Sequence, residues 1–135
     1  MASIFSRIIA GEIPCYKVAE TERAFAFLDI RPLTQGHTLV VPKMEVDSLF
    51  ELPEEDYEAV FELVRAVAEA QKAVIPCYRV GLSVLGFEVP HAHVHVVPLR
   101  SEADLNFANP KLQLEPEEFA ELAHRLQSAL AVPSI

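Results

Sequence analysis

Three of the chain's five histidines, His91, His93 and His95, stand in one short segment and are separated by single apolar residues. This alternation has the period of a β-strand, in which successive side chains point to opposite faces. We therefore expect the three imidazoles on one face of a strand, each roughly 6–7 Å from the next. Ala92 and Val94 then face the core. Histidine donates, accepts, attacks or binds metal near neutral pH, so the pattern favours a chemical role.

One chemistry open to this segment is metal binding. A His-x-His pair on a strand can offer two ligands to one zinc ion. The first and third imidazoles, however, lie roughly 13 Å apart along a strand, too far to share an ion. His37 or Glu88 could complete a site, although the chain has neither a CxxC pair nor a helical histidine motif. A histidine-ligated metalloenzyme is therefore the minor alternative.

The other chemistry is covalent catalysis by an imidazole. A neutral imidazole attacks phosphorus readily, while neighbouring groups hold the phosphoryl oxygens and keep the attacking nitrogen unprotonated. This chemistry employs all three histidines, which a single metal ion does not. The segment therefore favours histidine-based chemistry on a phosphorus centre.

Length, composition and charge limit the classes of protein. With 135 residues, 51% of them hydrophobic, a single domain over residues 1–135 is expected. No apolar run approaches the roughly 18 residues that span a bilayer, and no signal peptide is recognisable, so we expect no membrane partner. Cys15 and Cys77 form no CxxC motif and suit a reduced, cytoplasmic setting. The net charge of −9 argues against nucleic-acid binding, while local cations would still allow a small anionic ligand.

Periodicity and turn residues divide the chain into a modest number of elements. An apolar lead-in over residues 4–9 precedes the first strand, and a polar segment over 101–110 precedes the last helix. Strands are predicted over 15–18, 24–28, 37–41, 78–85 and 91–99. Helices are predicted over 53–74, where Pro53 and three acidic residues mark the start, and over 116–130. The sequence predicts an α+β fold with a mainly antiparallel five-stranded sheet, one long central helix and a C-terminal helix.

The predicted central helix is apolar on two sides. Both stripes have helical spacing, and they consist of Tyr57, Val60, Phe61, Val64 and Ala68, and of Leu63, Val67, Ala70 and Val74. A helix of this kind must be covered on both sides. A second subunit is the favoured cover, which predicts a homodimer, and packing within one chain is the alternative.

Four blocks of the chain together resemble the histidine-triad (HIT) superfamily, whose signature is His-φ-His-φ-His-φ-φ with φ apolar. The segment from His91 to Val97 matches that signature. The segments over residues 4–14, 26–32 and 36–43 resemble the family's opening, second and third blocks in the same order. The resemblance extends to Arg100 and is nearest to the bacterial Hint-like branch. It implies a HIT-fold homodimer.

This resemblance also implies an activity. Family members cleave nucleoside phosphoramidates or dinucleoside polyphosphates at the α-phosphate, by hydrolysis or nucleotidyl transfer, through a nucleotidyl-histidine intermediate. A purine nucleotide with an AMP or GMP moiety would be the small-molecule partner. By motif position, His93 would be the nucleophile and His95 would contact the α-phosphate and the bridging atom. His91 and His37 would set the tautomers, and Asp29 would accept hydrogen bonds from the ribose hydroxyls.

The resemblance further implies the nucleotide-binding residues. Those expected around the base and sugar are Ile4, Phe5, Phe27, Leu28, Ile30 and Leu39. Those expected beside the phosphate are Ser83, Phe87, Glu88 and Val89.

The chain departs from the family pattern beside the phosphate. Phe87 cannot donate a hydrogen bond, Glu88 would repel an anion, and Gly81 replaces a family asparagine. Backbone N–H groups over residues 86–89 could still bind an anion. A nucleotide-binding protein without catalysis is therefore the main alternative.

A further departure concerns zinc. Zinc-carrying bacterial relatives have two cysteines around the opening block and a histidine after the third. Here Ser3 and Ser6 occupy the first two positions, and Met44-Glu45 follows the third block. We expect no structural zinc and no cofactor. The groups that recognise the leaving group are expected over residues 101–110 or on the partner subunit.

Overall fold

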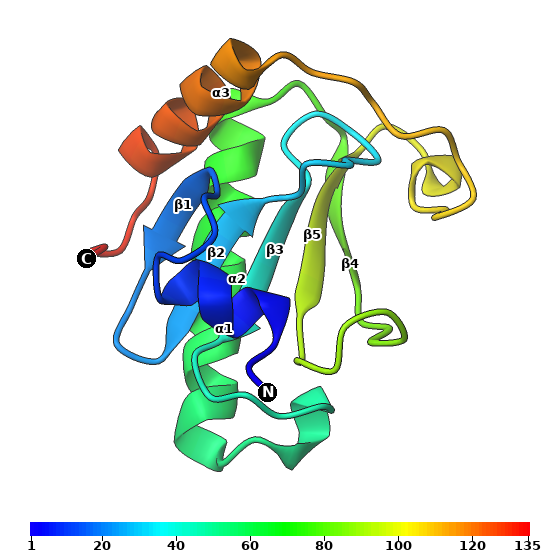
Figure 1. The fold of residues 1–135 in the computed structure, drawn as a ribbon. Helices are drawn as coiled ribbons and strands as arrows, with labels where there is room; N and C mark the ends of the chain where they lie inside the picture. Colours follow the sequence, from blue (N-terminus) through cyan, green and yellow to red (C-terminus); the bar gives the residue numbers. More distant parts are fainter.

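Five strands form one antiparallel sheet in the order β1-β2-β3-β5-β4, as the computed structural model of residues 1–135 shows (Figure 1). The strands are β1 Lys17–Glu20, β2 Ala24–Leu28, β3 Thr38–Pro42, β4 Arg79–Ser83 and β5 Val94–Leu99. The helices are α1 Ile4–Ile9, α2 Glu54–Val74 and α3 Pro116–Ser128, and the 3-10 turns are η1 Leu49–Glu51 and η2 Glu102–Asp104. The architecture is α+β and open, as predicted from the sequence.

Helix α2 has clear start and stop signals. It follows Pro53 and carries three acidic residues in its first turn, where negative charge is favourable. Its last residue is Val74. The next residue, Ile75, has an extended backbone (φ −112°, ψ 127°), which suits a residue before proline, here Pro76. No helix of the structure is both long and apolar enough to cross a membrane.

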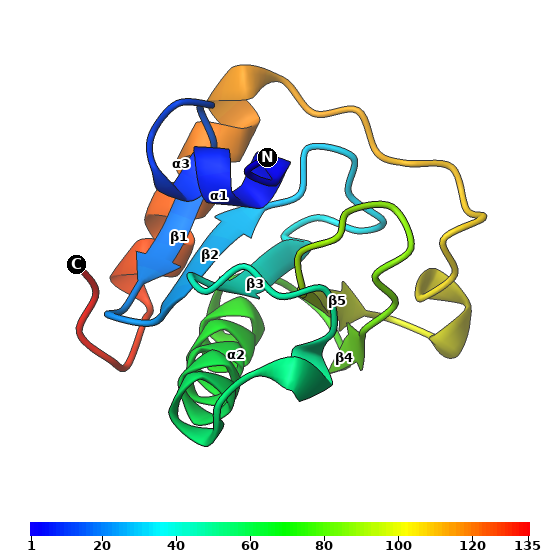
Figure 2. The ribbon, with the colours of Figure 1, turned by 60° about the horizontal axis from the view of Figure 1, so that its bottom comes forward.

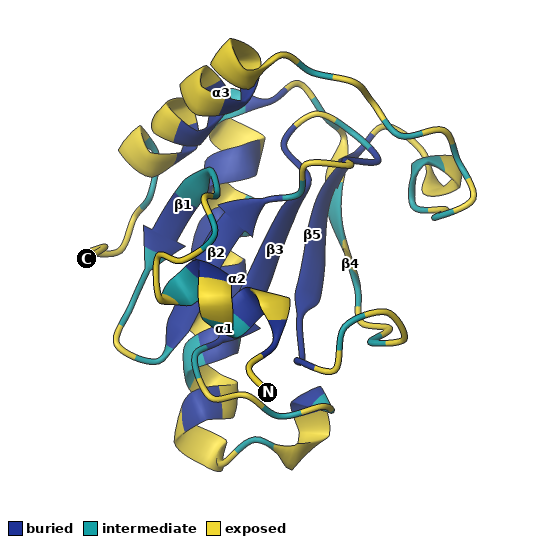
Figure 3. Cartoon of the chain, in the orientation of Figure 1, coloured by how far each residue is buried: buried dark blue, intermediate teal, exposed yellow.

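The sheet is covered on both faces, and Figure 2 shows α1 and α2 on opposite sides of it. Because strand side chains alternate, Ala26 and Leu28 join the main core beneath α2 and α3. Phe25 and Phe27 point the other way, into a smaller core with Phe5 of α1. Strands β2, β3 and β5 are therefore buried throughout, whereas the edge strand β4 is partly exposed (Figure 3).

Several predicted elements need correction. Residues 4–9, predicted only as an apolar lead-in, form a helix; six residues are too few for periodicity to reveal it. The predicted strand over 91–99 begins only at Val94, because the ladder to β3 ends at the Val40–Val94 pair and the ladder to β4 ends at the Ser83–His95 pair. The first strand lies two residues later than predicted, at 17–20.

The two apolar stripes of α2 are covered only in part within one chain. Five residues of the two stripes are buried within one chain, namely Val60, Leu63, Val64, Val67 and Ala70. The sheet packs against one side of the helix, and α3, which also contacts β1 and β2, packs against it as well. Tyr57 is exposed and Phe61, Ala68 and Val74 are only partly buried, so a second subunit against this helix stays a prediction.

Candidate active site

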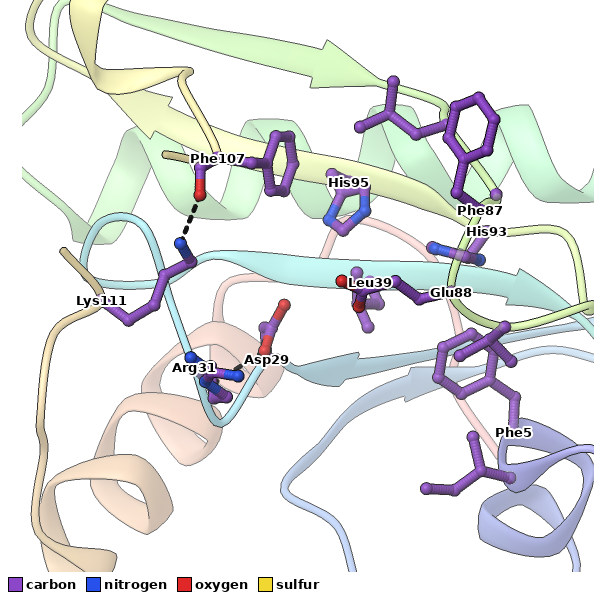
Figure 4. A pocket seen from close by; sticks show the side chains of 14 residues that line it. Phe5, Asp29, Arg31, Leu39, Phe87, Glu88, His93, His95, Phe107 and Lys111 are labelled. Carbon is purple, nitrogen blue, oxygen red and sulfur yellow. Dashed lines mark hydrogen bonds between the residues drawn. The ribbon is translucent and has the colours of Figure 1, made fainter. Parts of the chain in front are cut away.

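A cavity of about 600 Å³ opens on the α1 side of the sheet (Figure 4). Helix α1, the turn after β2, strands β3 and β5, the loop before the histidine segment and the segment after η2 all contribute to it. The side chains that line it are Ile4, Phe5, Asp29, Arg31, Leu39, Leu85, Gly86, Phe87, Glu88, Val89, His93, His95, Phe107 and Lys111.

Most of the predicted site residues meet at this cavity. Two of the three histidines of the motif, His93 and His95, line it together with Asp29. His37 and His91 lie outside its lining and are fully buried. Phe27 also lies outside the lining, with its ring 5.6 Å from that of Phe5. The other predicted residues in the lining are Ile4, Phe5, Leu39, Phe87, Glu88 and Val89.

Three further predicted residues also lie outside the cavity lining. Leu28 packs in the main core, because it alternates with Phe27 and so faces α2. Ile30 is 66% exposed and lies outside the lining. Ser83 pairs with His95 across β4 and β5 but does not line the cavity either.

The cavity also contains residues that were not predicted individually. Phe107 lies with its ring 4.7 Å from that of His95 and 6.3 Å from that of His37. It comes from the polar segment predicted to recognise the leaving group, where it is the only aromatic residue. Lys111 holds this segment in shape by donating to the carbonyl oxygens of Phe107 (2.6 Å) and Asn109 (2.9 Å). Neither position carries a motif that would have identified it.

The backbone fixes the tautomer of His93. Its Nδ1 lies 2.8 Å from the carbonyl oxygen of His91, and a carbonyl oxygen only accepts. Nδ1 must therefore carry the hydrogen, which leaves Nε2 of the neutral ring with a free lone pair. No group of the protein bonds to Nε2, while the Phe5 ring packs edge-on at 5.0 Å. In its neutral form, His93 thus presents a nucleophilic nitrogen at the cavity.

A second series of hydrogen bonds fixes the opposite tautomer in His95, with the hydrogen on Nε2. The backbone N–H of Leu33 donates to His37 Nδ1 at 3.0 Å, so His37 carries its hydrogen on Nε2. That Nε2 lies 2.9 Å from His95 Nδ1, which must accept. His95 is left with a hydrogen on Nε2. With the rings of His93 and His95 only 5.1 Å apart, a lone pair and an N–H donor stand side by side.

Burial favours the neutral forms of His37, His95 and His91. It lowers the pKa of His37 to about 3, with help from the neighbouring His95. Burial and the nearby His93 lower the pKa of His95 to about 4. The pKa of His91 is lowered as well, mainly by burial. Burial raises the pKa of Asp29, although the backbone N–H of Arg31 opposes this by donating to the carboxylate at 2.8 Å.

The depressed pKa values predict a specific loss of stability in mild acid. An unfolded histidine has a pKa of about 6.5. Below this pH the histidines of the unfolded chain become protonated, whereas His37 and His95 of the folded chain stay neutral. The free energy of unfolding should therefore fall as the pH drops from about 6.5 toward 5, by about 1.4 kcal/mol per pH unit for each such histidine. Urea denaturation at closely spaced pH values measures this slope. The exposed His124, changed to Gln, should leave it unaltered, and a flat profile from pH 7 to 5 would contradict the buried neutral cluster.

The structure brings together a set of possible metal ligands that differs from the predicted set. Donor atoms of Asp29, His37 and His95 lie within 4.8 Å of one another. Of the ligands predicted for such a site, His37 and His95 belong to this group, whereas Glu88 and a second histidine of the His-x-His segment do not. An ion held by both imidazoles would have to replace the 2.9 Å bond between His37 and His95. The resting geometry therefore favours a hydrogen-bonded histidine pair.

Known proteins resemble this chain in sequence and in fold. The family model of the HIT domain matches residues 10–102. The adenosine 5′-monophosphoramidase of Schizosaccharomyces pombe is 37% identical over 136 residues, which cover 96% of this chain and 99% of the relative. The crystal structure of a zinc-bound histidine triad family protein from Mycobacterium smegmatis has a TM-score of 0.80 at 30% identity, covering 97% and 94% of the two chains. A hypothetical histidine triad nucleotide-binding protein from Sulfolobus tokodaii has a TM-score of 0.77 at 27% identity, covering 93% and 89%.

Proposed function

Because the chain belongs to the histidine-triad (HIT) family, we propose that it hydrolyses nucleoside 5′-phosphoramidates, releasing a nucleoside monophosphate and an amine. The observation that carries this proposal is the neutral Nε2 lone pair of His93 beside the N–H of His95. The name of the S. pombe relative supports the substrate class. Dinucleoside polyphosphates and nucleotidyl transfer to another acceptor would use the same attack.

The proposed reaction has two steps. His93 Nε2 forms a bond to the α-phosphorus as the phosphorus–nitrogen bond breaks, and the leaving nitrogen takes a proton from solvent while the His95 Nε2–H donates a hydrogen bond to it. Water then attacks the phosphorus and breaks its bond to His93, while the water's proton returns to solvent. The site residues thus return to their starting state, and the products are a nucleoside monophosphate and an amine.

Asp29 is proposed to bind the ribose. It lies at the cavity with its Oδ2 3.6 Å from His37 Nε2, and it directly follows β2, where it accepts from the backbone N–H of Arg31. We expect Asp29→Asn to raise KM about tenfold with a smaller change in kcat, because bonds to a charged acceptor are worth roughly 1.5–3 kcal/mol. Steady-state kinetics with ribo- and 2′,3′-dideoxyribo-phosphoramidates measures this. The variant should lose most of the preference for the ribonucleotide, and an unchanged preference would remove Asp29 from the ribose site.

The proposed activity is tested by following AMP release from adenosine 5′-phosphoramidate in the presence of a chelator. Turnover under these conditions would support histidine catalysis, whereas turnover that requires added metal would favour the cluster of Asp29, His37 and His95. Tight AMP binding without turnover would instead favour the nucleotide-binding alternative. That alternative draws on Phe87, which stands at the cavity where a hydrogen-bond donor would aid the phosphate.

We also propose a homodimer, built on strand β4 and the loop after it. Strand β4 is an outer strand of the sheet, so one side of its backbone has no sheet partner. Apolar side chains are exposed along this region, namely Leu82, Val84, Leu85 and Phe87. Contiguous exposed apolar surface of this kind typically marks an interface.

Charge placed on this edge should separate the subunits. We expect Leu82→Glu to shift the protein from dimer to monomer in analytical ultracentrifugation, because the carboxylate would be desolvated at the interface. Phe50→Glu, an exposed apolar position on η1, is the matched control and should leave the mass unchanged. A wild-type protein that sediments as a monomer at micromolar concentration would refute the dimer.

A further inference from the structure

A cluster of polar side chains outside the cavity joins three separate parts of the chain. Ser3 Oγ lies 2.6 Å from His91 Nδ1, and Ser6 Oγ lies 3.4 Å from the same nitrogen. Glu45 Oε1 accepts from the backbone N–H of Ser3 at 2.8 Å and from the Ser6 hydroxyl at 2.6 Å. The start of α1, the loop after β3 and the histidine segment before β5 thus meet at one point.

The four side chains do not form a zinc site. Zinc in proteins takes thiolate, imidazole and carboxylate ligands, and neutral serine hydroxyls are not among them. Ser3 and Ser6 therefore cannot supply the pair of thiolates expected of zinc-carrying relatives. Hydrogen bonds join the same positions instead.

The direction of each hydrogen bond follows from the acceptors. The Pro42 carbonyl oxygen lies 2.8 Å from His91 Nε2 and only accepts, so Nε2 carries the hydrogen and Nδ1 accepts. The Ser3 hydroxyl must then donate to Nδ1, while its oxygen accepts from the Ser6 backbone N–H at 3.0 Å. The Ser6 hydroxyl gives its one hydrogen to Glu45. Every donor in the cluster has an acceptor, so the arrangement is self-consistent.

The cluster bears directly on the geometry of His93. Residues 91–93 precede β5 and lack its ladder bonds, and the Ala92 N–H to Val46 O bond of 2.7 Å ties their backbone to the loop that carries Glu45. The His91 carbonyl oxygen is the group that holds His93 Nδ1. The same cluster anchors α1, whose Phe5 packs against both His91 and His93.

We propose that Ser3, Ser6, Glu45 and His91 form a metal-free clasp in which Glu45 is a positioning residue for His93. By holding the two serines, Glu45 fixes α1 and the ring of His91, and thereby the carbonyl that selects the reactive tautomer of His93. Its catalytic consequence rests on the function proposed above, whereas the tautomer selection does not. Glu45 acts here as a double acceptor through one oxygen, a role that an amide oxygen can also fill.

The clasp is tested first without any substrate. Imidazole nitrogen spectra of the whole protein, recorded by NMR, report which nitrogen of each histidine carries the hydrogen. In the wild type we expect hydrogen on Nε2 of His91 and on Nδ1 of His93. Glu45→Ala should give a mixture of tautomers at His93, and Glu45→Gln should restore the wild-type pattern. Glu69→Ala, which removes an exposed carboxylate from α2, is the matched control. Wild-type tautomers in Glu45→Ala would overturn the proposal.

Kinetics supplies the second readout. With adenosine 5′-phosphoramidate, Glu45→Ala should lower kcat about tenfold and change KM less, since small displacements of reacting groups cost one to two orders of magnitude in rate. Glu45→Gln should recover most of this loss, and Ser6→Ala combined with Glu45→Ala should cost little more than either change alone. Equal losses in Glu45→Ala and Glu69→Ala, or fully additive losses in the double variant, would overturn the proposal. If the wild type releases no AMP, the proposed function fails, and the NMR comparison alone decides the clasp.

Discussion

His93→Ala should lower kcat/KM for adenosine 5′-phosphoramidate by roughly 10⁴-fold or more, because it removes the nitrogen that attacks phosphorus. The wild-type ring has its Nδ1 occupied by the His91 carbonyl oxygen, so Nε2 is the nitrogen available for attack. AMP affinity should change much less, since Asp29 and the apolar lining remain in place. Initial rates, together with calorimetric titration of AMP, measure the two quantities separately.

Matched variants distinguish loss of the nucleophile from loss of the fold. His124→Ala removes an exposed imidazole on α3 and should leave the rate unchanged. His93→Ala should keep the melting temperature within a few degrees of the wild type, because the ring borders a cavity and not the main core. Substantial turnover by a folded His93→Ala protein would mean that another group, or water, attacks the phosphorus directly.

Gly36→Ala should destabilise the protein by about 3 kcal/mol, a change of two orders of magnitude in the unfolding equilibrium. Gly36 has φ +92°, a left-handed conformation that costs a residue with a Cβ roughly 1–2 kcal/mol. An added Cβ would also lie 2.1 Å from Cδ1 of Ile75, so this buried side chain would have to move. Since His37 follows directly, its bond to His95 should loosen as well.

Gly11→Ala is the control for this change. Gly11 also has a positive φ, +81°, but an added Cβ would meet no atom within 4 Å. We expect Gly11→Ala to lower the free energy of unfolding by only about 1 kcal/mol, because only the cost of the left-handed backbone conformation applies. Urea denaturation of both variants gives the difference, and equal losses would show that Ile75 moves aside freely.

Much of the fold is predictable because local patterns and tertiary packing agree. Strand β2 lies at 24–28 as predicted, since two turn regions bound an apolar run that is covered on both faces. Helix α2 agrees to within a residue, because Pro53, three acidic residues and Pro76 define its ends. The edge-strand boundaries and α1 are less predictable. They depend on which other segments of the chain pair with these residues, and no local sequence pattern indicates those partners.

The chemistry of the site is predictable from the histidine spacing only in part. Alternation correctly places Ala92, Val94 and Val96 in the main core. It wrongly extends the strand back to His91, since the ladders to β3 and β4 end at Val94 and His95.

Residues that reach the site from distant parts of the chain were not predicted, because no local pattern marks them. Phe107 reaches His95 from a loop with no periodic pattern, and Glu45 reaches Ser3 from 42 positions away in the chain. Leu28 was placed beside the nucleotide although it alternates with Phe27 and therefore faces the main core.

The central claim is that His93 becomes covalently linked to the nucleotide. Rapid acid-free quenching of the wild type with adenosine 5′-phosphoramidate, followed by proteolysis and mass spectrometry at alkaline pH, tests it directly. We expect an adenylyl group on the peptide that contains His93, formed at least as fast as steady-state turnover and absent in His93→Ala. Full turnover with no adenylylated peptide at the earliest times, or adenylylation of another residue, would contradict it.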